Sequence, residues 1–272
     1  MNVKYVDAHC HLQLKQYTQD REEIIERMRE DDIVAIVVGD DLESSKQALL
    51  LAEKHEYLFA SVGVHPDHIG QEFFDEIAFH ELAMHKKVVA IGECGLDYYR
   101  LPNNETSYSA EATKDKQKEL FRKHIALAIE LDKPLMIHAR PSAGARDAYE
   151  DMISILKEEK INSKLRGNIH FFSGTLEEAQ EFFALGFTIS FTAVITFTHD
   201  YDTVIKTVPL TNILSETDAP FVAPASRRGE RNDSLSIIEV VAKIAEIRGE
   251  NIETVRKELL SNAERLFTLQ TA

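Results

Sequence analysis

Histidines recur at the ends of short apolar runs in this chain of 272 residues. His9 and His11 end the first of these runs. Two residues apart on an extended segment, their side chains point the same way and can chelate one metal ion. A lone pair of histidines is a weak indicator, because neighbouring histidines also serve as ordinary polar residues. A metal site requires further ligands from elsewhere in the chain.

Carboxylates and histidines of the required types follow other apolar runs. They are Glu93, His138, His170 and Asp218. Glu93 has two oxygens and is a candidate bridge between two metals, and the glycines beside it would let backbone and ligands approach closely. Taken singly, Glu93 could be an ion-paired buried glutamate, each histidine a core histidine, and Asp218 a turn residue before Ala-Pro. Their joint positions favour a metal site.

Eight apolar runs rich in β-branched residues are the elements that would bring these ligands together. We predict strands at residues 3–9, 33–39, 58–65, 88–93, 134–138, 167–172, 187–191 and 213–216. Polar stretches with helical periodicity alternate with them, at residues 21–30, 42–55, 73–85, 114–131, 145–159, 176–185 and 200–207, before two final helices at 234–248 and 252–267. Catalytic residues of a (β/α)8 barrel lie at the carboxyl ends of its strands. The pattern therefore predicts a single α/β domain over residues 1–272, a (β/α)8 TIM barrel with additional C-terminal helices.

The charge balance limits the classes of partner. The net charge is −15, which argues against broad electrostatic binding of nucleic acid. Local cations are available in the loop from Arg227 to Arg231, which we consider either a phosphate-binding loop or a solvated surface loop.

The remaining composition favours a cytoplasmic enzyme. The chain has no apolar run of membrane-spanning length and no signal peptide pattern at its start. Cys10 and Cys94 each lie beside a candidate ligand, so we expect them to face the other side of their strands as buried apolar residues. Residues 101–110 are polar and follow the fourth strand, which makes them either a mobile active-site loop or an inert insertion.

The chemically loaded segments resemble, in order, the signatures of the TatD family of metal-dependent hydrolases. They are Asp7-Ala-His-Cys-His11-Leu12, Gly92-Glu-Cys-Gly-Leu-Asp97-Tyr98, Ile137-His138-Ala-Arg140, His170-Phe-Phe-Ser-Gly174 and Glu216-Thr-Asp218-Ala-Pro220. Gly63-Val-His65-Pro66 and Arg228-Gly-Glu-Arg231-Asn232 extend the likeness over almost the whole chain. The resemblance implies an amidohydrolase-like barrel with a divalent-metal site and, in characterised members, deoxyribonuclease activity.

The resemblance also implies roles for individual residues. His9, His11, Glu93 and Asp218 would hold one metal, and Glu93, His138 and His170 a second. His65 would contact a substrate phosphate, together with Arg140, Arg228 and Arg231. The sequence departs from the family pattern at Gln13, His124 and Ser234, which removes no expected ligand.

We therefore expect two divalent ions, Mg, Mn or Zn, to activate water for hydrolysis of phosphodiester bonds at nucleic-acid ends, with DNA favoured over RNA. Asp218 is the candidate general base and Glu93 the shared ligand. One alternative is hydrolysis of an ester or amide, such as an aminoacyl-tRNA. Another is a non-catalytic barrel that keeps metal for stability or binds a partner.

Overall fold

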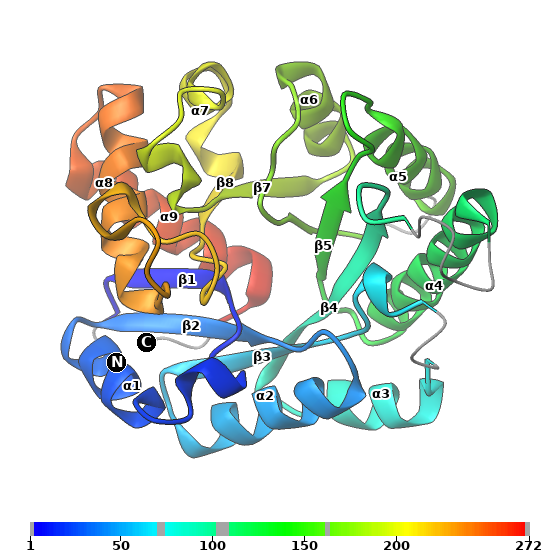
Figure 1. The fold of residues 1–272 in the computed structure, drawn as a ribbon, viewed down its shortest axis with the longest axis horizontal. Coiled ribbons are helices and arrows are strands. Elements are labelled where there is room, and N and C mark those ends of the chain that lie inside the picture. The colour runs from blue at the N-terminus through cyan, green and yellow to red at the C-terminus, as the bar shows by residue number, and fades with distance from the viewer. Residues whose placement is uncertain (1–2, 70–73, 102–108, 161–163, 270–272) are drawn as a thin grey trace.

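The computed structural model describes residues 3–69, 74–101, 109–160 and 164–269. Eight parallel strands follow one another in chain order, and helices surround them (Figure 1). The strands are β1 Tyr5–Cys10, β2 Ile33–Val38, β3 Leu58–Val62, β4 Val88–Asp97, β5 Leu135–Arg140, β6 Gly167–Ile169, β7 Phe187–Phe191 and β8 Ile213–Ser215. This architecture confirms the predicted (β/α)8 barrel.

The described helices follow the strands in the expected alternation. They are α1 Arg21–Glu30, α2 Leu42–Lys54, α3 Glu76–Ala83, α4 Ala110–Glu130, α5 Asp147–Glu159, α6 Leu176–Ala184, α7 Asp202–Thr207, α8 Ile237–Arg248 and α9 Ile252–Phe267. The last helix packs against β1 and β8 and is the additional C-terminal element. Every helix in the described part of the chain is too short or too polar to cross a membrane.

The strands form because their residues suit burial on both faces. Ile33–Val38 is a continuous apolar run and all six residues are buried, as expected for a parallel strand covered by core inside and helices outside. The helix that follows begins at a capping box, in which the Asp41 carboxylate accepts from the Ser44 backbone amide and Ser44 reaches back.

The barrel closes where the ends of β1 and β8 meet. Cys10 and Ala219 form an isolated parallel bridge. The His11 amide donates to the Ala219 carbonyl at 2.7 Å, and the Asp218 amide donates to the His9 carbonyl at 2.9 Å. Closure therefore sets the first and the last of the candidate ligands side by side.

Strand β4 is longer than predicted, since it continues past Glu93 to Asp97. Its pairing with β5 shifts register between Ile91 and Cys94. Gly92 lies in this irregular stretch with φ +145°, and a Cβ there would overlap the Met136 carbonyl oxygen. Only glycine allows this close approach of β4 to β5, so the glycine beside Glu93 has a packing role.

Other strand and helix boundaries differ from the predicted ones by a few residues. The predicted sixth strand stops at Ile169, before Phe171 adopts a positive φ of 46°. Residues 234–236 form a 3-10 turn before α8, and α4, capped by Ser109, begins at Ala110, four residues earlier than predicted. Of the loop at 101–110, residues 102–108 lie outside the described residues, and so does residue 73 at the predicted start of the third helix.

Candidate metal centre

The first cluster consists of side chains from the end of β1 and from the segment after β8, which meet where the barrel closes. The Nε2 atoms of His9 and His11 lie 3.1 Å apart. Asp218 Oδ1 lies 3.8 Å from the first of these nitrogens and 3.6 Å from the second. Asp218, three residues after the end of β8, takes a positive φ of 53°, a turn conformation that aspartate tolerates better than most residues.

The second cluster comes from β5 and the end of β6. His138 Nδ1 lies 3.3 Å from His170 Nε2. Both nitrogens approach Glu93 Oε1, at 3.1 and 2.9 Å.

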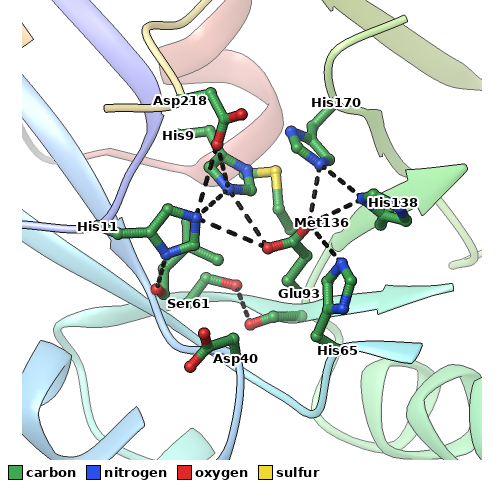
Figure 2. A network of polar contacts seen from close by, with 12 residues as sticks. His9, His11, Asp40, Ser61, His65, Glu93, Met136, His138, His170 and Asp218 are labelled. Carbon is green, nitrogen blue, oxygen red and sulfur yellow. Dashed lines mark hydrogen bonds and ion pairs between the residues drawn. The ribbon is translucent and has the colours of Figure 1, made fainter. Parts of the chain in front are cut away.

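Glu93 lies between the two clusters and divides its oxygens between them (Figure 2). Its Oε2 atom lies 3.5 Å from His9 Nε2 and 3.8 Å from His11 Nε2, whereas Oε1 faces the second cluster. The six side chains singled out from the sequence thus meet at one mouth of the barrel.

The electrostatics keep both carboxylates ionised. Burial would raise the pKa of Glu93, but the nearby imidazoles of His170, His65 and His9 hold it well below its usual range. Burial likewise opposes ionisation of Asp218, and the contact with His11 lowers the pKa of Asp218. Ionised carboxylates are the form that binds a cation and the form that accepts a proton.

The donor set fits divalent cations. Three groups of potential ligands among the described residues each hold their ligand atoms within 4.8 Å of one another: His9, His11 and Asp218; His9, Glu93 and His170; and His65, Asp97 and His138. Two nitrogens that bind one tetrahedral zinc at ~2.0–2.1 Å lie about 3.3 Å apart. The two nitrogen pairs, at 3.1 and 3.3 Å, are close to that separation.

Two ligand histidines are oriented by hydrogen bonds on the side away from the clusters, and a third lies near a carboxylate. His11 Nδ1 donates to the Val38 carbonyl at 2.8 Å, so its Nε2 carries the lone pair that faces the first cluster. His138 Nε2 donates to Asp97 Oδ2 at 3.0 Å, which leaves Nδ1 for the second cluster. His170 Nδ1 lies 3.6 Å from Glu216 Oε1. The hydrogen bonds made by His11 and His138 fix the tautomer and raise the basicity of these two ligands.

Asp97 and Glu216 are the residues to which the sequence interpretation assigned no role. Both are fully buried. Asp97 lies four residues after Glu93, and Glu216 lies two before Asp218. Even spacing places residues on the same face of a strand, which is the signal that could have identified both.

The clusters form the floor of a cavity of about 750 Å³. His65 and Arg140, for which the family resemblance implied substrate contact, line this cavity, with His65 Nε2 3.5 Å from Glu93 Oε1 and the Arg140 guanidinium 4.1 Å from the Tyr99 ring. Asp40, Asp67, His68 and Arg100 line it as well.

Arg228 and Arg231 are not among the residues that line this cavity. Arg231 forms an ion pair with Asp20 at 2.5 Å and lies over the Tyr17 ring. Arg228 stacks on Phe197, 3.8 Å from the ring centre. The structure therefore separates the predicted phosphate contacts into an inner pair and an outer pair.

The cysteines and His124 lie away from the ligand clusters that the described residues form. Cys10 and Cys94 are free and buried, and Cys10 Sγ donates to the Ile36 carbonyl. His124 is buried in α4, where Nε2 accepts from the Val64 amide at 3.0 Å. It supports the segment that carries His65.

Comparisons with known proteins agree with this architecture. Residues 6–268 match the family model described as TatD related DNase. The chain is 38% identical to the uncharacterized metal-dependent hydrolase YabD of Bacillus subtilis, over 97% of this chain and 98% of that protein. It is 32% identical to the 3'-5' ssDNA/RNA exonuclease TatD of Pantoea ananatis, over 97% and 99% of the two chains.

A solved structure extends the match to three dimensions. The crystal structure of YjjV, a TatD homologue from Escherichia coli, superposes with a TM-score of 0.85 at 27% identity, over 99% of this chain and all of that one. The chain belongs to the TatD family of metal-dependent hydrolases.

Proposed function

We propose that this TatD-family hydrolase is a two-metal phosphodiesterase that shortens single-stranded nucleic acid from the 3′ end, with DNA favoured over RNA. The observation that carries the proposal is the division of the two Glu93 oxygens between two histidine clusters at the floor of one cavity. A carboxylate in this position can hold two cations close together, the arrangement that phosphoryl-transfer enzymes use.

The residues have distinct roles in the proposed reaction. His9, His11, Glu93 and Asp218 would hold one cation, and Glu93, His138 and His170 would hold the other. Bound Mg, Mn or Zn ions would lower the pKa of the attacking water and offset charge on the phosphoryl oxygens. Asp218, kept ionised, accepts the proton of that water. His65 and Arg140 contact the phosphate from the cavity wall.

The preference for a strand end follows from charge and shape. The chain carries a net charge of −15, so a long duplex gains little attraction from the surface as a whole. A cavity of about 750 Å³ admits the end of a strand rather than a helix. The relative from Pantoea ananatis is named as a 3'-5' ssDNA/RNA exonuclease, which supports cleavage from the 3′ end of the strand.

Turnover of two substrates at equal metal concentration tests the proposal. Purified protein supplied with Mg, Mn or Zn is expected to shorten a short single-stranded oligonucleotide, and a chelator is expected to stop the reaction. Intact oligonucleotides together with rapid hydrolysis of an aminoacyl ester would replace the phosphodiesterase assignment with a carbonyl ester hydrolase.

A further inference from the structure

The cavity above the metal centre has two chemically different walls. The loops after β3 and β4 and the last residue of β5 contribute the basic side chains His65, His68, Arg100 and Arg140, which we call the basic wall. Loops after β6, β7 and β8 contribute Phe171, Val194, Tyr201, Phe221 and Val222, which we call the apolar wall. A bound molecule therefore meets arginine and imidazole side chains on one side, where Asp67 pairs with Arg100 at 2.8 Å, and carbon surface on the other.

Two rings of the apolar wall lie directly against candidate metal ligands. Phe221 meets the His11 ring edge to face, with centroids 6.0 Å apart and planes at 72°. Phe171 meets the His170 ring in the same way, at 6.4 Å and 73°. A group that packs on either ring is therefore close to the position where the scissile bond must lie.

Phe221 is the most accessible ring of this wall. Its side chain is 49% exposed, although the loop that carries it is tied down, since the Phe221 amide donates to the Asp218 carbonyl at 2.9 Å. Of the large apolar side chains that are exposed in the described residues, the three aromatic ones are Tyr99, Phe197 and Phe221, and all follow barrel strands at this mouth. An exposed ring on a fixed loop offers a stacking surface at little entropic cost.

We propose that the apolar wall binds the base of the terminal nucleotide, with Phe221 as the stacking ring, while the basic wall binds the adjoining phosphates. This inference rests on the proposed function and specifies which part of the substrate each wall recognises. A nucleotide has both an anionic and a flat apolar part, joined by a short sugar, and matches the two walls. The cavity volume lies within the ~300–1,000 Å³ usual for sites that enclose small ligands.

Recognition by stacking has a consequence for specificity. Every base has a π face, so a stacking ring accepts all four bases and favours an unpaired one. A 3′ end held in a duplex would have to unpair its last base before it could reach Phe221. The enzyme is expected to prefer single-stranded or frayed ends and to tolerate changes of terminal base.

An abasic substrate tests the contact from the ligand side. Two oligonucleotides are compared, one with an intact 3′-terminal nucleotide and one with a tetrahydrofuran abasic unit in its place. For the metal-loaded wild type, kcat/KM is expected to fall about tenfold on loss of the base, within the range for one base–aromatic stack. Phe221→Ala should lose about tenfold on the intact end and almost nothing on the abasic end.

Two further variants separate stacking from a distorted metal centre. Phe221→Tyr should restore the preference for the intact end, and Leu50→Ala, which removes an exposed apolar side chain on the outer helix α2, should leave it unchanged. Metal content is measured for every variant, and equal content is expected. Phe221→Ala that keeps the full preference, or a wild type that cleaves both ends equally, would overturn the inference alone. Failure of the wild type to cleave either end would overturn the proposed function and this inference with it.

Discussion

The two halves of the metal centre use the same ligand types but are supported differently. On the β1 side, His11 donates to the neutral carbonyl of Val38. On the β5 and β6 side, His138 donates to the Asp97 carboxylate and His170 lies beside the Glu216 carboxylate. A carboxylate behind an imidazole makes it a stronger metal donor than a carbonyl does. Similar ligand sets can therefore bind metal with different strengths, because the supporting residues differ.

The burial of the two carboxylates behind His138 and His170 strengthens the contrast between the two halves of the metal centre. Asp97 and Glu216 are fully buried, and burial alone would raise the pKa of Asp97. The hydrogen bond from His138 lowers the pKa of Asp97 below its usual value instead. The β5 side thus depends on charge pairing within the barrel, whereas the β1 side depends on backbone geometry at the closure.

Glu93→Ala is expected to have the largest effect, because it removes the one ligand that both halves share. Both metals should be lost, and turnover should fall to background. Elemental analysis and circular dichroism are measured on the same sample, and a native-like spectrum is expected. A variant that keeps its metal and its activity would contradict the bridging role.

Asp218→Asn should reduce kcat by about 10²–10⁴-fold at full metal occupancy, since an amide cannot accept the proton of the attacking water. KM should change little. Steady-state kinetics are read together with metal content, so that lost metal is not mistaken for lost chemistry. An unchanged kcat in the fully loaded variant would exclude Asp218 as the base.

Asp97→Asn should weaken metal binding about 10–100-fold on the β5 side only. Titration calorimetry of the metal-free protein should then resolve one tight and one weakened event. Asp147→Asn is a matched control after β5, because the Asp147 carboxylate pairs with Lys114 and Ser142 and touches no ligand histidine. Equal weakening of both events by Asp97→Asn would remove the distinction between the two halves.

His124 is a neutral buried histidine that supports the segment carrying His65, and its contribution to stability should depend on pH rather than on metal. Burial lowers the pKa of His124 to about 4 from a usual value of 6.5. The unfolded chain therefore binds the proton first as pH falls, so the stability is complete above pH 6.5 and is lost towards pH 4.

Between pH 7 and pH 5 this one group should cost the wild type about 2 kcal/mol of unfolding free energy. His124→Gln, whose amide can make both hydrogen bonds, should lack that loss in paired denaturant titrations. Parallel pH profiles for the two proteins would show that the fold does not lower the pKa of His124.

The strand pattern and the ligand types could be predicted because both are local. Short apolar runs such as Ile33–Val38 indicate buried strands, and a histidine or carboxylate that ends such a run is visible in the chain itself. The barrel then explains how His9 and Asp218, 209 residues apart in the chain, come together, because the mouth of a barrel gathers the carboxyl ends of all its strands.

The positions of the carboxylates behind the ligand histidines, and of Arg228 and Arg231, depend on contacts between segments that are far apart in the chain. Asp97 has a role because β4 continues beyond Glu93, which the register shift at Gly92 makes possible. Arg231 is held by Asp20, from the opposite end of the sequence, and so lies outside the cavity that its motif suggested. The spacing from Glu93 indicates the face of Asp97 only once β4 is known to continue that far, and the position of Arg231 is decided by packing against a distant segment.

The positions of the bound ions test the central claim most directly. Crystals of metal-loaded protein are measured at the absorption edge of Mn or Zn, and anomalous difference peaks are located. We predict two peaks, one among His9, His11, Glu93 and Asp218 and one among Glu93, His138 and His170, with Glu93 touching both. A single peak, or two peaks of which one has no contact with Glu93, would contradict the bridged two-metal centre.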